Sequence, residues 1–127
     1  MISTQIQKPA SELTLFSLTE LSTGDDMGWA ASYIAKLKAG ETVSFRPRGN
    51  SMAGKIASGQ LCTVTPVYDR SLLSVGDIIL CKVGGYEYFH LIKAIRGNRY
   101  QIGNNRGGIN GWIGADQIFG RCIRVDD

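Results

Sequence analysis

One serine and the only histidine of the chain have the residue types and settings that nucleophilic catalysis needs. Ser51 lies between Gly49 and Gly54 in a segment typical of a turn, which would expose its hydroxyl and aim backbone N–H groups at one point. His90 lies in the apolar, aromatic segment YEYFHLIKAI, which is typical of a β-strand. An imidazole can accept the proton of a serine hydroxyl at neutral pH, so the pair suggests acyl transfer. The alternative is structural: a turn serine, and a histidine packed on a sheet.

Lys93 is a competing base on the same predicted strand. Side chains along a strand alternate between its two faces, so residues three positions apart point to opposite sides. We therefore expect Ser51 to meet either His90 or Lys93 across this strand, and not both.

The elements that must position these residues are mostly short β-strands. After Gly40, apolar segments alternate with Gly, Asp and Asn turns, which predicts a mainly β fold with a strongly bent antiparallel sheet or partly open barrel. One N-terminal helix is predicted near residues 26–38, with acidic residues at its start and Gly40 as its C-cap. The expected strands are Thr42–Pro47, Gln60–Val67, Asp77–Val83, Tyr86–Ile95, Tyr100–Gly103 and Phe119–Val125. We expect an arm at 1–25, a helix leading into the core at 26–40, and a β domain at 41–127.

Composition indicates an ordinary globular domain. The 127 residues are 43% hydrophobic and 20% charged. No apolar run approaches the ~20 residues that cross a bilayer, and the N-terminus lacks a hydrophobic signal segment, so we expect a cytoplasmic protein without a membrane anchor. Three cysteines without CxxC spacing are expected to be buried free thiols, with no metal site, and no cofactor is expected.

Charge is distributed unevenly along the chain. Residues 1–35 carry one Lys and four acidic residues, whereas residues 36–124 carry 13 Lys/Arg and five acidic residues, a net of +8. Such a basic body could meet nucleic acid or an acidic partner. Because the basic residues are scattered and do not alternate with aromatic ones, a solvated surface is favoured and nucleic-acid binding is not expected. Arg46 and Arg48 could hold a carboxylate or phosphate, although solvation of a strand end is the favoured interpretation.

Four segments occur in an order that carries more information than any of them alone. They are Gly49-Asn50-Ser51-Met52, then Gly76-Asp77, then the strand with His90, and finally Gly103-Asn104-Asn105 before Gly120. Over about residues 41–125 this order resembles the catalytic domain of the S24/S26 peptidase superfamily, which includes LexA/UmuD-like self-cleaving proteins and type I signal peptidases.

The resemblance implies a fold and a set of roles. The fold would be a coiled, mostly antiparallel β-structure of the LexA/signal peptidase type. Ser51 would be the nucleophile, Met52 a buried wall residue beside it, and His90 the base of a Ser-His dyad. Bacterial signal peptidases and LexA-like proteins usually have Lys at the base position, whereas the archaeal and endoplasmic-reticulum signal peptidases have His.

The resemblance is incomplete at the group that would orient His90. Histidine-type signal peptidases carry an Asp after a Gly-Asp-Asn turn, but here the turn is Gly-Asn-Asn and the following RGGINGW has no acid. The candidates to replace that Asp are Asn104, Asn105, Asn110 and Asp116. An Asp-to-Asn change in a Ser-His-Asp enzyme lowers the rate ~10⁴-fold through the wrong tautomer, whereas Cys-His-Asn enzymes do use an amide.

Two functions remain open. An arm, a helix and then the core resemble the layout of UmuD-like proteins, which suggests a soluble serine peptidase acting on peptides or proteins, its own arm included. Thr23-Gly24 and Ala39-Gly40 are small-residue pairs of the kind such sites accept, although Ala39-Gly40 suits a helix cap. The alternative is a non-catalytic binding or assembly module, which the missing Asp and the lack of an anchor favour. In that case residues 1–22 would be the interaction segment of a homo-oligomer.

Overall fold

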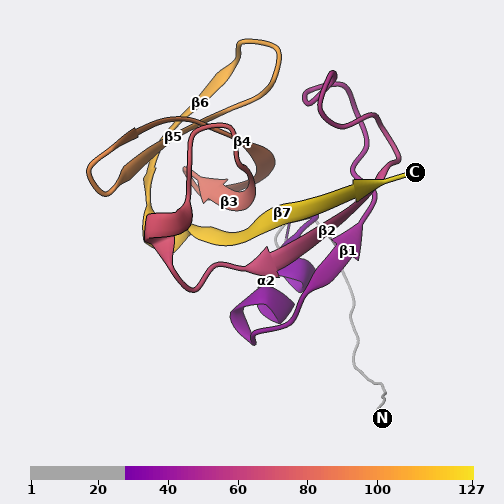
Figure 1. Cartoon of the computed structure of the whole chain (residues 1–127), viewed down its shortest axis with the longest axis horizontal. Helices are drawn as coiled ribbons and strands as arrows, with labels where there is room; N and C mark the ends of the chain where they lie inside the picture. The colour runs from indigo at the N-terminus through magenta and orange to yellow at the C-terminus, as the bar shows by residue number, and fades with distance from the viewer. Residues whose placement is uncertain (1–27) are drawn as a thin grey trace. The chain divides into compact units, whose positions relative to one another are not determined.

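Seven antiparallel strands and one α-helix provide most of the regular structure of residues 28–127, the part of the chain that the computed structural model describes (Figure 1). The strands form one sheet in the order β1-β2-β7-β3-β4-β5-β6. The strands are β1 Val43–Phe45, β2 Leu61–Pro66, β3 Ile78–Val83, β4 Tyr86–Arg96, β5 Arg99–Gly103, β6 Ile109–Gly114 and β7 Ile118–Asp126. The helix is α2 Ala31–Lys38, and two 3₁₀ turns are η1 Arg70–Leu72 and η2 Ala115–Gln117.

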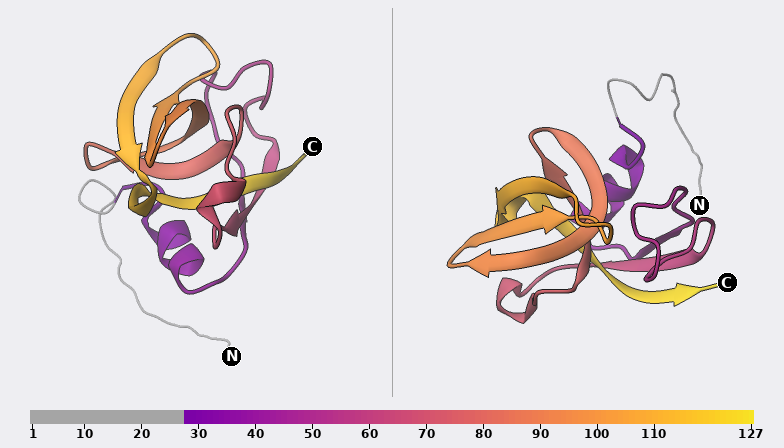
Figure 2. Two further views of the ribbon diagram at one scale, coloured as in Figure 1. Left: turned by 60° about the vertical axis from the view of Figure 1, so that its left-hand side comes forward. Right: turned by 90° about the horizontal axis from the view of Figure 1, so that it is seen from above.

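The sheet curls on itself into a half-barrel, as the two views of Figure 2 show. Register shifts interrupt four of its strand pairs, namely β2 with β7, β3 with β7, β4 with β5 and β5 with β6. An extra residue in one strand bends it and increases its twist, so repeated bulges close a sheet of short strands. The mainly β fold expected from the sequence is therefore confirmed.

Apolar side chains fill both faces of this curled sheet. Inside the curl, the largest fully buried side chains include Ile79, Ile92, Ile102 and Ile118. On the other face, α2 packs so closely on the sheet that a Cβ at Gly120 of β7 would lie 2.9 Å from Leu37 Cδ1 of the helix. Close packing on both faces makes β3, β4 and β7 a rigid base for side chains that project from them.

The helix is shorter than the one predicted over residues 26–38. It begins at Ala31, after a turn, and Gly28 has a φ of 76°, which lies in the left-handed region outside a right-handed helix. The predicted residues 26 and 27 and the arm at 1–25 lie outside the described residues. The C-cap prediction is confirmed, since Gly40 has a φ of 89° and its N–H donates to the Leu37 carbonyl at 3.0 Å.

All six predicted strands are present within one or two residues of their expected bounds, but the sequence reasoning missed β6. Asn110-Gly111 in that segment is typical of a turn. In the structure Gly111 has a φ of 147° and pairs with Ile102 beside a bulge. A glycine at a bulge thus continues the strand, where the pattern indicated its end.

The three cysteines are free thiols. Cys62 and Cys81 are buried, as expected, and Cys122 is half-buried. Burial raises the pKa of the Cys81 thiol to about 12, because the low-dielectric interior disfavours the thiolate. Among residues 28–127, no helix is both long and apolar enough to cross a bilayer.

Candidate functional site

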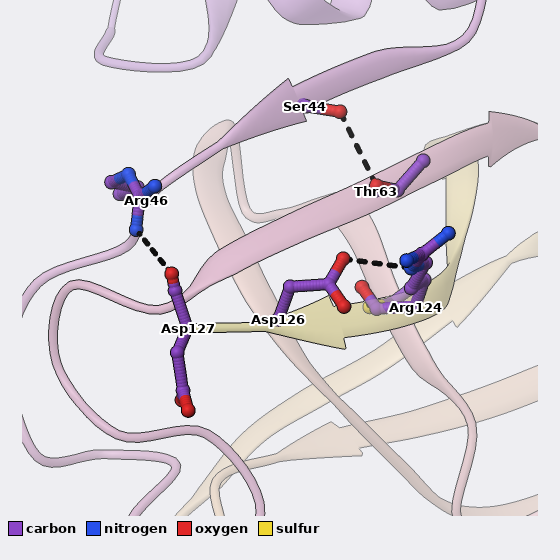
Figure 3. A network of polar contacts seen from close by, with 7 residues as sticks. Ser44, Arg46, Thr63, Arg124, Asp126 and Asp127 are labelled. Atoms are coloured by element: carbon purple, nitrogen blue, oxygen red, sulfur yellow. Dashed lines mark hydrogen bonds and ion pairs between the residues drawn. The ribbon is translucent and has the colours of Figure 1, made fainter.

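Ser51 lies in the loop of residues 46–60, and both ends of this loop are held by the end of the chain. Arg46 Nη1 donates to the Gly59 carbonyl at 2.8 Å and to the Asp127 carbonyl at 3.3 Å. Gln60 Nε2 donates to Asp127 Oδ1 at 3.0 Å. Figure 3 shows the Arg46–Asp127 contact beside the ends of the neighbouring strands. The Arg46 guanidinium thus closes the loop, which accounts for one of the two arginines near Ser51.

The turn that carries Ser51 is anchored by its neighbour. Met52 is only 5% exposed, and its carbonyl accepts the N–H of Ile56 at 2.8 Å. The half-buried Ser51 precedes this anchor. Among residues 28–127, the N–H groups of Ser51 and Met52 donate to no protein acceptor. The turn therefore keeps two backbone donors beside the Ser51 hydroxyl.

A second turn, residues 104–108, holds the Ser51 turn from outside. The Asn105 N–H donates to the Ser51 carbonyl at 2.8 Å, and Asn105 Nδ2 donates to the Ala53 carbonyl at 2.7 Å. Asn104 shapes this second turn, because its Oδ1 accepts the N–H of Gly108 at 2.8 Å. Asn105 therefore fixes the backbone on both sides of the Met52 anchor.

His90 projects from β4 toward Ser51. Its Nε2 lies 3.2 Å from Ser51 Oγ, and its Nδ1 lies 2.7 Å from Asn110 Oδ1 on β6. The Tyr88 ring, two residues away on the same strand face, stacks on the imidazole with ring centroids 5.2 Å apart. The directly opposite residue on β3 is the fully buried Ile79. Contacts with Tyr88 of β4, Asn110 of β6 and Ser51 thus hold the ring in one orientation.

These contacts assign the tautomer of His90. The Asn110 Oδ1 is a carbonyl oxygen and can only accept a hydrogen bond. The His90 Nδ1 therefore carries the proton, which leaves Nε2 as an acceptor for the Ser51 hydroxyl. This is the arrangement in which an imidazole can act as a general base toward a serine.

The competing base is turned elsewhere. Lys93 lies at the register shift between Ile92 and Ala94, and its Nζ donates to the Asn104 carbonyl at 3.1 Å. Ser51 therefore meets His90 and not Lys93, so the expectation that only one of them reaches the serine agrees with the structure. Lys93 instead connects β4, the strand of His90, to the turn of residues 104–108, which holds the Ser51 turn.

Of the four candidates for orienting His90, the structure brings only Asn110 to the ring. Asn104 is occupied within its own turn and Asn105 with the Ser51 turn. Asp116 lies in η2, where its Oδ2 accepts a hydrogen bond from Gln117 Nε2 at 3.3 Å. The sequence reasoning did not single out two further contributions, the clamp by Asn105 and the stacking of Tyr88. The spacing of Tyr88, two residues from His90 on a strand, was a usable signal for the second.

The described part of the chain offers no cluster of metal ligands at this site. Within residues 28–127, no three His, Cys, Asp or Glu side chains gather closely enough to hold an ion. The donors near Ser51 are instead an imidazole, two amides and backbone groups. Their chemistry suits proton transfer and charge stabilisation by hydrogen bonds.

Comparison with known proteins identifies no family for this chain. No protein-family model matches it, and a search of curated proteins finds no match. The resemblance to the S24/S26 peptidases, drawn from the order of short motifs, therefore stays a prediction, and function must be argued from the geometry of Ser51, His90 and Asn110.

If Ser51 and His90 carry out acyl transfer, replacing Asn110 with Asp is expected to raise kcat/KM at neutral pH by about tenfold or more, because a carboxylate would still accept the Nδ1 proton and would also stabilise the imidazolium. The rate of peptide cleavage, or of serine labelling by a fluorophosphonate, measures the change. Asn104→Asp is the matched control, since it adds the same charge to a residue that does not touch the ring. A folded Asn110→Asp protein with a lower rate than the wild type would contradict the orienting role.

Proposed function

We propose that this protein is a serine peptidase in which Ser51, His90 and Asn110 act together. The observation that carries the proposal is the continuous set of contacts from Ser51 Oγ to His90 Nε2 at 3.2 Å and from His90 Nδ1 to Asn110 Oδ1 at 2.7 Å. A nucleophile within reach of a base, with that base oriented by a third group, is the usual structural basis for nucleophilic acyl transfer.

The first half of the reaction forms an acyl-enzyme. Ser51 Oγ attacks the carbonyl carbon of the scissile peptide bond while its proton passes to His90 Nε2. The Asn110 amide oxygen holds the Nδ1 proton and keeps the ring aligned. The N–H groups of Ser51 and Met52 stabilise the negative charge that develops on the carbonyl oxygen.

The second half restores the enzyme. The protonated His90 Nε2 gives its proton to the departing amine, and the C–N bond breaks. A water molecule, deprotonated by the same nitrogen, then attacks the Ser51 ester. The bond between the acyl carbon and Ser51 Oγ breaks, Nε2 returns the proton to Oγ, and the carboxylic acid is released. Because Asn110 is neutral, the imidazolium gains less stabilisation than it would from an Asp, and turnover is expected to be slow. Slow turnover suits a protein that processes few substrate molecules.

The substrate class is a peptide or protein, and the N-terminal arm of the chain itself is a candidate. The pair Thr23-Gly24 lies outside the described residues. The other small-residue pair is occupied by the helix end, because the Ala39 N–H bonds to the Ala35 carbonyl at 3.1 Å and Gly40 caps α2. Self-processing is therefore proposed at Thr23-Gly24 and not at Ala39-Gly40.

The test uses the purified wild-type chain. It is incubated at neutral to alkaline pH alone, with a mixed peptide library, and with a fluorophosphonate that reacts only with an activated serine. Mass spectrometry is expected to find one label, on Ser51, together with cut peptides. Heat-denatured protein is the control and should take no label, since the activation needs His90 in place. A folded protein that neither cleaves nor labels would contradict the proposal.

A second candidate is a binding or assembly module on a peptidase-like scaffold. The observation that favours it is the neutral Asn110 in the place where an acid would support catalysis. It predicts that the folded chain binds peptides without cutting them. The labelling experiment separates the two functions, because a module has no need of a reactive serine.

A further inference from the structure

The segments that build the site carry charge of one sign. They are residues 46–60 with Ser51, residues 90–93 with His90, and residues 103–111 with the Asn105 clamp and Asn110. Together they contain no Asp or Glu. Their charged residues are Arg46, Arg48, Lys55, Lys93 and Arg106.

Three of these five cations have no ion pair or side-chain hydrogen bond to another group of residues 28–127. Arg46 closes the loop around Ser51, and Lys93 is bound to the Asn104 carbonyl. The other three, Arg48, Lys55 and Arg106, are exposed, and none of them forms an ion pair within residues 28–127. They therefore remain available to a ligand.

Two of the three cations sit on the turns that contact each other at the site. Lys55 closes the turn that begins at Ser51, where its N–H bonds to the Met52 carbonyl at 3.0 Å. Arg106 follows Asn105, the residue bound to the Ser51 carbonyl. Both cations therefore belong to turns that contact the Ser51 backbone.

Opposite charges attract each other appreciably when they lie within the Debye length, which is ~8–10 Å at physiological salt. A cluster of basic side chains attracts anionic ligands and raises their local concentration. The acidic residue that contacts this loop, Asp127, binds Arg46 and Gln60 at the two ends of the loop and neither Lys55 nor Arg106.

We propose that the site selects acidic peptides, with Asp or Glu side chains flanking the bond held at Ser51. This deepens the proposed function and rests on it for the cleavage step, although peptide selection can be measured without cleavage. The sequence offers a matching ligand in the chain itself, since Asp25 and Asp26 directly follow Thr23-Gly24.

A peptide fits these loops better than a nucleic acid does. Proteins that hold single strands combine cations with aromatic side chains on which bases stack. Residues 46–60 and 103–111 contain no aromatic residue. An extended peptide needs only carboxylates for the cations and a carbonyl for Ser51.

The experiment measures binding to the full chain carrying Ser51→Ala, so that nothing is consumed. The probes are two fluorescein-labelled peptides of one sequence, with Asp and Glu at the flanking positions in one and Asn and Gln in the other. At low salt the acidic peptide is expected to bind about fivefold tighter or more, and in 0.5 M NaCl the difference should fall below about twofold.

Reversing the charges of Lys55 and Arg106 tests whether these two residues cause the preference for the acidic peptide. The double variant Lys55→Glu/Arg106→Glu is expected to weaken binding of the acidic peptide about tenfold and to leave the amide peptide unaffected. The matched control, Lys36→Glu/Arg99→Glu, reverses two exposed charges on α2 and β5, outside the site segments. It should change either affinity by less than about twofold. Circular dichroism confirms that both variants are folded.

Three outcomes would overturn the inference. They are equal affinity for the two peptides, an equal loss in the control variant, and tighter binding of a single-stranded oligonucleotide of the same net charge. Failure of the proposed function looks different: the wild type would take no fluorophosphonate label, while selective binding of the acidic peptide would persist and support the inference.

Discussion

Replacing Ser51 with alanine is expected to lower kcat/KM by about 10³-fold or more, to the level of the background reaction. The change removes the atom that forms the acyl-enzyme, and no other hydroxyl contacts His90 Nε2 within residues 28–127. Peptide cleavage followed by mass spectrometry gives the rate, and loss of the fluorophosphonate label gives an independent readout.

Ser44→Ala serves as the control for the serine substitution. Ser44 is an exposed residue of β1 whose hydroxyl interacts with Thr63 at 3.3 Å, outside the site (Figure 3). The kcat/KM of the Ser44→Ala variant is expected to equal that of the wild type. If Ser51→Ala kept full activity while remaining folded, the nucleophile assignment would be wrong, and any cleavage would have to come from another group.

Replacing His90 with alanine is expected to lower the rate by about 10²–10⁴-fold, the usual contribution of a positioned general base. Without the imidazole, no other side chain in the described part of the chain (28–127) forms a hydrogen bond with Ser51 Oγ and could take its proton. The loss should be largest near neutral pH and should shrink at alkaline pH, where hydroxide replaces the missing base. A pH–rate profile of the wild type and the variant measures this difference.

Lys93→Met provides the comparison that identifies the base. Lys93 contacts the Asn104 carbonyl and not Ser51, so its loss should loosen the clamp on the Ser51 turn and cost far less than the loss of His90. The shape of its pH–rate profile should match that of the wild type. If kcat/KM were lower for Lys93→Met than for His90→Ala, Lys93 would be the base and His90 would have the supporting role.

The fold was largely predictable because its signals are local. Alternating apolar segments bounded by turn residues predicted six of the strands, and Gly40 predicted the end of α2. These patterns act through neighbouring residues, by side-chain alternation and by the backbone freedom of glycine. The same dependence on local signals explains why β6 was not predicted. Gly111 is locally typical of a turn, and only its pairing with Ile102 makes it part of the sheet.

By itself the sequence determined which residue types could react: one Ser in a glycine-flanked turn, one His on a strand, and four polar candidates beside them. It could not choose Asn110 from Asn104, Asn105 and Asp116, because that choice depends on how β4, β5 and β6 pair in the curled sheet. The roles of Lys93 and Asn105 were decided in the same way, by contacts between turns far apart in the chain. Long-range pairing and bulges set those contacts, and neither is encoded in the residues next to each side chain.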